Sequence, residues 1–250
     1  MGRRAARLWS SAVAVVVGAL LLPAGAGAIV GGEVDNGGHP NVAFVAAFQD
    51  GNLADACTGT LIAASVVLTA AHCLAPGVQY AVSFRPAVDL SGSDNKFLAV
   101  TSFQSDSQYD VGVLLLAQPA TSLYPTIRPA RLPRQGALDQ YRRGSSFTHV
   151  GFGVDSSPPP GQPPAYDLIH FTRRTLTAAL TKLSTALIYT RNPDGSICHG
   201  DSGGPVFSGT GVLVALGNYA TTRCQGTNSG PRLDIKPVQD FLRLYAAVPS

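Results

Sequence analysis

A serine flanked by glycines is the part of this sequence with the clearest chemical potential. It is Ser202, within the hexapeptide Gly-Asp-Ser-Gly-Gly-Pro at residues 200–205. A serine hydroxyl is a weak nucleophile that becomes useful only where its surroundings activate it. Flanking glycines allow a tight turn, and they let a substrate carbonyl approach backbone N–H groups that could hold an oxyanion. The alternative is a Gly- and Pro-rich surface turn, so the stretch needs support from elsewhere in the chain.

Two further stretches carry residue types that could activate the serine. His72 lies in Leu-Thr-Ala-Ala-His-Cys at residues 68–73, and Asp110 opens the apolar run Val111–Leu116. An imidazole can accept a hydroxyl proton, and a carboxylate can orient the imidazole. Read alone, the histidine could be structural and the aspartate could cap a strand. Together with the serine they supply the three groups of a nucleophilic site.

The three stretches resemble the active-site segments of the trypsin/chymotrypsin-like serine peptidases. Their order along the chain, His then Asp then Ser, is the chymotrypsin-type order and differs from those of subtilisin and the α/β-hydrolases. The resemblance implies that Ser202 attacks a carbonyl, that His72 moves the proton, and that Asp110 fixes the imidazole tautomer. It also implies that the N–H groups of Gly200 and Ser202 hold the oxyanion.

The first 28 residues have the pattern of a secretory signal peptide. Arg3, Arg4 and Arg7 give a basic start, residues 8–22 are largely apolar, and Ala-Gly-Ala at residues 26–28 fits a cleavage site. An uncleaved membrane anchor is the alternative, but the apolar run is short for a bilayer span of about 20 residues. We therefore expect a secreted, extracellular protein with no stable membrane association after signal cleavage.

The residues that follow the predicted signal, Ile-Val-Gly-Gly at 29–32, resemble the activated amino terminus of the same family. The resemblance implies that the Ile29 ammonium inserts into the protein and pairs with Asp201. A buried carboxylate is costly unless a charge or several hydrogen bonds satisfy it. We hypothesise that signal peptidase itself produces this terminus. Cleavage after Ala26 also fits the small-x-small rule and would leave a short propeptide.

Composition outside the signal bounds the class of protein. Removing three arginines from the 18 basic residues leaves 15, equal to the 15 acidic residues, so we expect no nucleic-acid surface. A charged fraction of 13% with 27 Gly and 18 Pro favours short strands joined by tight turns. Four cysteines in a secreted chain indicate two disulfides with three possible connectivities. No Cys-x-x-Cys or clustered His/Cys spacing suggests zinc, and we expect no metal and no cofactor.

The family resemblance also implies the fold. We expect an all-β protein with two six-stranded antiparallel β-barrels and a C-terminal helix, forming one peptidase domain over residues 29–250. The first barrel is expected at about 29–130 and the second at about 145–236. Apolar residues on one side of the last segment predict the helix at about 237–248.

The disulfide pairing and the specificity pocket come from the resemblance as well. It pairs Cys57 with Cys73 and Cys198 with Cys224. A further set of residues is then expected to bind substrate, with the first at the base of the pocket: Ser196, Asn218, Tyr219, Ala220 and Gly230. A neutral serine at the base cannot pair with Lys or Arg, so cleavage after medium or large apolar residues is expected. Asn218 stands where the family usually has a serine beside the catalytic carboxylate.

The function expected from these features is that of a secreted serine endopeptidase acting on polypeptides through an acyl-enzyme. We expect a monomer, with protein protease inhibitors as further partners. Two alternatives belong to other classes. One is a catalytically silent, protease-like binding protein, although such relatives usually lose a triad member. The other is a secreted β-domain acting in adhesion, which would leave the ordered motifs as coincidence.

Overall fold

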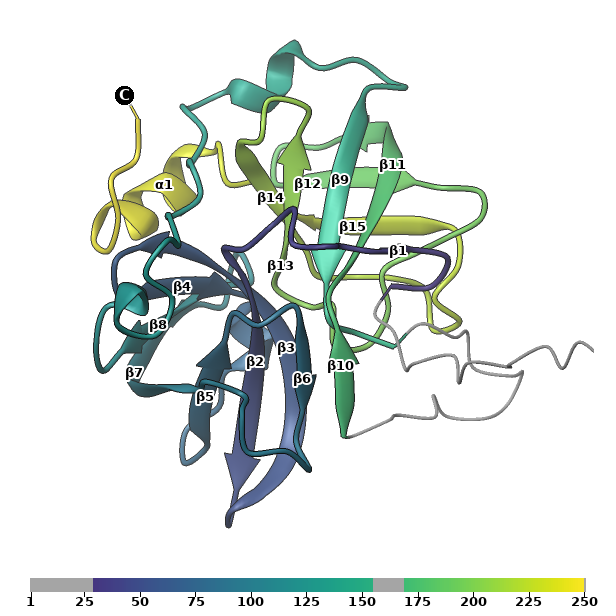
Figure 1. Cartoon of the computed structure of the whole chain (residues 1–250). Helices are drawn as coiled ribbons and strands as arrows, with labels where there is room; N and C mark the ends of the chain where they lie inside the picture. Colours follow the sequence, from purple (N-terminus) through teal and green to yellow (C-terminus); the bar gives the residue numbers. More distant parts are fainter. Residues whose placement is uncertain (1–28, 155–168, 250) are drawn as a thin grey trace, which may run out of the picture.

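The computed structural model describes residues 29–154 and 169–249 (Figure 1). The predicted signal peptide, residues 1–28, lies outside the described residues. The described chain forms two β-rich halves that lie against each other, and the strands of the first half precede most of those of the second in sequence.

The first half is a closed barrel in the order β2-β3-β4-β8-β7-β5. All of its pairings are antiparallel, and the strands are β2 (Val42–Gln49), β3 (Asn52–Ala63), β4 (Val66–Thr69), β5 (Gln79–Ser83), β7 (Leu98–Asp106) and β8 (Val111–Leu116). The β-branched and apolar residues of β4 and β8 are buried because the barrel closes around them. The 3-10 turn Ala71–Cys73 directly follows β4 and carries His72.

The second half is a sheet in the order β14-β13-β9-β11-β12-β15. Its antiparallel strands are β9 (Ser146–Gly151), β11 (Arg174–Leu183), β12 (Leu187–Arg191), β13 (Gly204–Ser208), β14 (Leu213–Gly217) and β15 (Thr227–Pro231). An antiparallel bridge between Ala215 and Arg232 joins its two ends. The expected all-β fold with two six-stranded barrels is therefore confirmed.

Two short strands pair across the halves of the chain. β1 (Glu33–Val34) pairs with β11, although it lies in the range expected for the first barrel. Conversely, β10 (His170–Thr172) pairs with β6 (Ala87–Asp89), and this pair forms a separate two-stranded sheet. The two halves therefore interleave, and the segment that begins at Ile29 belongs structurally to the second barrel.

The C-terminal helix α1 (Lys236–Arg243) ends before the boundary near residue 248 that the apolar pattern predicted. Pro237 in its first turn has a fixed φ compatible with a helix start. Val238 and Leu242 are fully buried and belong to the same apolar core as β4 and β14. Beyond Arg243, Tyr245, Ala246 and Val248 pack on the core without continuing the helix, whereas Leu244 is 73% exposed.

A buried ion pair fastens the interface between the barrels. Arg173, which is 1% exposed, donates from Nε to Asp35 Oδ2 at 2.7 Å and from Nη1 to the Val42 carbonyl at 3.0 Å. Phe44 and Phe152 meet edge-to-face beside it, with ring centroids 5.9 Å apart. Arg173 precedes β11 of the second barrel, and its hydrogen bonds reach Asp35 of the N-terminal segment and Val42 of β2. The ion pair therefore connects that segment and both barrels.

Candidate active site

His72 and Asp110 meet at the boundary of the two barrels. The His72 ring lies with Nδ1 2.9 Å from Asp110 Oδ2 and 3.1 Å from Oδ1. The backbone N–H of His72 also donates to Asp110 Oδ1 at 3.0 Å. A carboxylate is acceptor-only, so Nδ1 carries the proton and Nε2 is left free to accept one. The imidazole is therefore held in the tautomer that a general base needs.

Three donors besides the His72 backbone converge on the Asp110 carboxylate, including two from the second barrel. Asn218 Nδ2 lies 2.8 Å from Oδ2, and the Tyr219 hydroxyl lies 2.5 Å from the same oxygen. Burial raises the pKa of Asp110, but the hydrogen bonds from His72 and Tyr219 outweigh it and lower the pKa to about 2. Asp110 is therefore ionised throughout the neutral range.

Ser202 lies beside His72 in one cleft. The cleft has a volume of about 490 Å³ and is lined from both barrels, with His72, Cys57, Phe152, Gly200 and Ser202 among its residues. The Ser202 carbonyl accepts a hydrogen bond from the Thr58 N–H at 2.9 Å, which fixes the backbone that carries the hydroxyl. Among the described residues no hydrogen bond joins the Ser202 hydroxyl to His72. Catalytic hydrogen bonds often tighten only when substrate is bound.

The loop before Ser202 is held from the first barrel. Thr58 Oγ1 donates to the Gly200 carbonyl at 2.8 Å and accepts from the Phe152 N–H at 3.0 Å. Gly200 has φ +91°, and a Cβ there would lie 2.8 Å from Gly153 Cα. Both the left-handed backbone and the close approach require glycine at this position. The loop conformation near the expected oxyanion site thus depends on contacts from two other segments.

Asp201 is buried behind the loop and meets the N-terminal segment. It is 1% exposed, and its carboxylate accepts hydrogen bonds from the N–H groups of Cys198 at 2.7 Å and Gly153 at 2.8 Å, and from that of Ile29. Burial raises the pKa of Asp201 to about 7 despite these hydrogen bonds. Ile29 is fully buried. The two residues that the sequence paired are therefore in contact in the structure.

The glycines of Val-Gly-Phe-Gly at residues 150–153 make room for this carboxylate. A Cβ on Gly151 would lie 2.1 Å from Asp201 Oδ1, and one on Gly153 would lie 2.7 Å from Oδ2. The Val30 carbonyl accepts from the Ser196 N–H at 3.0 Å, so the N-terminal segment also pairs with the chain leading to Ser202.

The residues expected to form the specificity pocket differ in their burial and in the contacts that hold them. Ser196 is fully buried and donates its hydroxyl to Asn228 Oδ1 at 2.5 Å. Tyr219 is held by its backbone, which exchanges hydrogen bonds with Ser229 at 2.9 and 2.8 Å. Ala220 is exposed, whereas Gly230 is buried with the Leu216 carbonyl only 1.9 Å from the position a Cβ would take. None of the five lines the cleft that holds His72 and Ser202.

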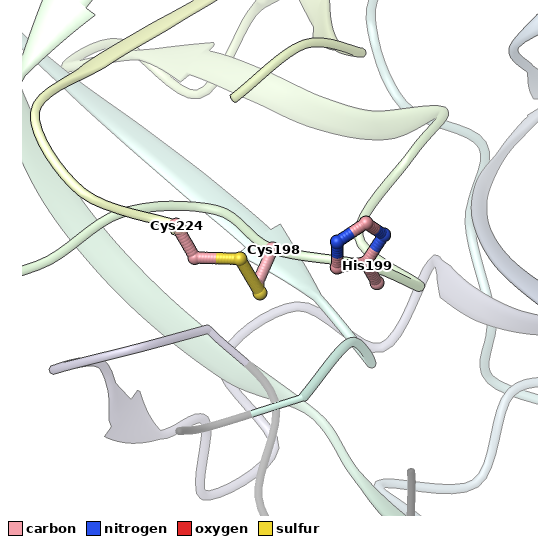
Figure 2. Close-up of side chains that lie close together, drawn as sticks. All are labelled: Cys198, His199 and Cys224. Atoms are coloured by element: carbon pink, nitrogen blue, oxygen red, sulfur yellow. A yellow bond between two sulfur atoms is a disulfide. The ribbon is translucent and has the colours of Figure 1, made fainter. Parts of the chain in front are cut away.

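Two disulfides flank the site. Cys57 is joined to Cys73, which tethers the turn of His72, and Cys198 is joined to Cys224, which tethers the loop before Ser202. Figure 2 shows His199 beside the second disulfide. The sulfur and ring nitrogen atoms of these three residues lie within 4.8 Å of one another. Metal binding by cysteine needs a thiolate, and both sulfurs are consumed in the disulfide, so we assign no metal site to this group.

A double barrel with a histidine, an aspartate and a serine at the junction defines a chymotrypsin-fold protein of the serine-peptidase type. The family model "Trypsin" matches residues 29–242, and the chain belongs to this family of trypsin-like serine proteases. No helix in residues 29–154 or 169–249 is long and apolar enough to span a bilayer.

Individual relatives agree with this assignment. Vitamin K-dependent protein C of Mus musculus is 31% identical over 207 residues, which cover 70% of this chain and 42% of that protein. The chain thus spans less than half of that relative. Trypsin alpha of Drosophila melanogaster is 25% identical, with 74% of this chain and 76% of that protein covered. Among solved structures, human heparin binding protein shares the fold with a TM-score of 0.67 at 21% identity, covering 89% of this chain and all of that one.

Several residues that shape the site could not be found from the sequence motifs. Thr58 follows a cysteine in an unremarkable strand, yet it connects Gly200 to Phe152. Asn228 holds Ser196 from strand β15, in a stretch with no recognisable motif. Tyr219 was expected to meet substrate, but its hydroxyl contacts Asp110. The one signal for Asn228 is that it is a polar residue at a buried position, and burial is known only from the structure.

Proposed function

We propose that this chain is a serine endopeptidase that hydrolyses peptide bonds through an acyl-enzyme. Ser202 attacks the substrate carbonyl while His72 takes its proton, and His72 then gives that proton to the leaving amine. Asp110 keeps the ring in the required tautomer and stabilises its charged form. The N–H groups of Gly200 and Ser202 hold the oxyanion. Water then hydrolyses the acyl-enzyme by the same proton transfers in reverse order.

One observation carries this proposal. The His72 ring is fixed by Asp110 on one side and shares a cleft with Ser202 on the other. A histidine with a purely structural role needs neither a carboxylate that accepts several hydrogen bonds nor a serine in the same cleft. Family membership supports the proposal, because trypsin-like proteases act on polypeptides.

Covalent labelling tests the proposal directly. A fluorophosphonate probe should label the secreted protein at Ser202, and Ser202→Ala should abolish both labelling and hydrolysis of a peptide substrate. Ser107→Ala is the matched control, since Ser107 is exposed and is not among the residues that line the cleft. Absence of labelling in folded protein would overturn the proposal and leave the silent binding protein as the better reading.

We further propose that cleavage follows medium or large apolar residues. The support is the neutral Ser196, whose hydroxyl is committed to Asn228 rather than to a carboxylate that could receive Lys or Arg. Chromogenic peptides ending in Phe, Leu or Arg distinguish the cases. Efficient hydrolysis of the Arg peptide alone would contradict this preference.

We propose that a free amine at Ile29 completes the oxyanion loop. An ammonium at the position of the present Ile29 N–H would neutralise Asp201, whose pKa burial otherwise raises. Amino-terminal sequencing of active, secreted protein should give Ile29 as the first residue, while a start at Gly27 would contradict direct activation by signal peptidase. We also propose that the protein is secreted, is monomeric and binds protein protease inhibitors. Size-exclusion chromatography of culture medium tests secretion and the monomeric state, and the same column run after addition of an inhibitor protein tests binding.

A further inference from the structure

The Tyr219 side chain connects the two barrels at the centre of the site. Its backbone is fixed in the second barrel by paired hydrogen bonds with Ser229. Its hydroxyl lies 2.5 Å from Oδ2 of Asp110, the residue that directly precedes β8 of the first barrel. A carboxylate accepts only, so the phenol must be the donor. The ring is partly exposed, at 43%, and its centroid lies 6.2 Å from that of His72.

We propose that Tyr219 is a positioning residue of the catalytic site, which acts through Asp110 to set the orientation and the basicity of His72. This inference rests on the proposed peptidase function and extends it to a residue that the sequence assigned only to substrate binding.

Competition for one oxygen atom gives the physical argument. Asp110 Oδ2 accepts from His72 Nδ1 at 2.9 Å, from Asn218 Nδ2 at 2.8 Å and from the Tyr219 hydroxyl. Hydrogen bonds to an ionised acceptor are strong, and each donor withdraws some of the negative charge available to the others. The Tyr219 hydroxyl therefore reduces the stabilisation that Asp110 gives to protonated His72. It also helps to fix the carboxylate plane, because it adds a further donor to those of His72 and Asn218.

The Tyr219 hydroxyl stays protonated over the working range. Burial raises the pKa of Tyr219, and the hydrogen bond to Asp110 raises it further. The other titratable side chains near His72 are Asp55 and His199, which line the same cleft from β3 and from the loop before Ser202. Asp110 is hydrogen-bonded to both His72 and Tyr219, so it is the link through which a change at Tyr219 reaches His72.

The test is Tyr219→Phe, which removes the hydroxyl and keeps the ring. With one donor fewer, Asp110 stabilises protonated His72 better, so the acid limb of the kcat/KM profile should move to higher pH by about 0.5–1 unit. The plateau kcat should fall by about three- to tenfold, since the carboxylate is held less firmly. A single-residue ester substrate should be used, because it has no group beyond the scissile residue that could contact Tyr219.

Tyr245→Phe is the matched control, because Tyr245 packs against Phe241 at the end of α1, away from the cleft. It should leave both the profile and kcat unchanged. An unchanged acid limb in Tyr219→Phe, within about 0.2 unit, would overturn the inference.

A second measurement separates failure of this inference from failure of the proposed function. The imidazole NMR titration of His72, assigned by comparison with His72→Gln, can be followed in both tyrosine variants without any substrate. A shifted midpoint in Tyr219→Phe with no esterase activity in wild type would support the Tyr219–Asp110 link while refuting the peptidase. Wild-type activity with unshifted titration and an unshifted acid limb would do the reverse.

Discussion

The space around the Asp201 carboxylate leads to a sharp prediction about Gly153. In Gly153→Ala the new Cβ would lie 2.5 Å from the His199 carbonyl oxygen and 2.7 Å from Asp201 Cγ. One neighbour is backbone, and the other is a buried side chain held by hydrogen bonds, so neither can yield cheaply. The Gly153 N–H itself donates to Asp201 at 2.8 Å, and displacement would weaken this bond.

The magnitude follows from these two effects. Overpacking a filled site costs about 1–3 kcal/mol, and a hydrogen bond to a charged group contributes about 1.5–3 kcal/mol. The two overlap, because one displacement causes both, so we expect a loss of about 3 kcal/mol. With a urea dependence of about 2 kcal/mol per molar, the unfolding midpoint should fall by about 1.5 M. Since Asp201 adjoins Ser202, the proposed nucleophile, kcat/KM should fall as well.

Circular dichroism is the appropriate probe for this urea titration. The one tryptophan, Trp9, lies in the predicted signal, so tryptophan fluorescence would not report on the mature protein. Gly209→Ala is the matched control, because a Cβ there has no atom within 4 Å. Equal midpoints for Gly153→Ala, Gly209→Ala and wild type would show that the Asp201 carboxylate does not occupy this space.

Three further predictions follow from buried groups. Because the pKa of Asp110 is lowered to about 2, its contribution of about 2 kcal/mol is present above pH 4 and lost as pH falls toward 2; Asp110→Asn should flatten acid unfolding over that range and reduce kcat by about 10⁴, whereas a steep acid transition in the variant would refute the assignment. Arg173→Met leaves buried Asp35 with His39 as its remaining side-chain partner and should cost about 3 kcal/mol by urea titration, and a loss below about 1 kcal/mol would contradict the ion pair. Replacing both Cys198 and Cys224 by serine should cost about 3 kcal/mol, and an unchanged thermal midpoint would contradict the role of this disulfide.

The family resemblance carried by short motifs predicted the double barrel, and local patterns predicted individual strands and the final helix. Short runs such as Val111–Leu116 are apolar because nearly all of their residues are buried in a closed barrel. The helix at Lys236–Arg243 was predicted in type, but its end was placed too late. Tyr245, Ala246 and Val248 extend the apolar pattern because they pack on the core, and packing does not require a helix.

The sequence by itself determined the candidate chemistry of the site. A serine between glycines, a histidine beside a cysteine and an aspartate before a buried strand are residue types with few joint uses, and their order selects one family. Each motif can be recognised in the sequence because the local backbone of its functional residue needs particular neighbours, such as the glycine with positive φ at residue 200.

Only the tertiary structure decided what surrounds those three groups. The hydroxyl of Tyr219 meets Asp110 across 109 positions of chain, and Thr58 meets Gly200 across 142. Hydrogen bonds of this kind depend on how the two barrels dock against each other. Docking in turn depends on buried contacts such as that of Arg173 with Asp35, which no sequence motif signals. Local pattern fixes which groups can react, whereas long-range packing fixes how strongly each is held and how basic it becomes.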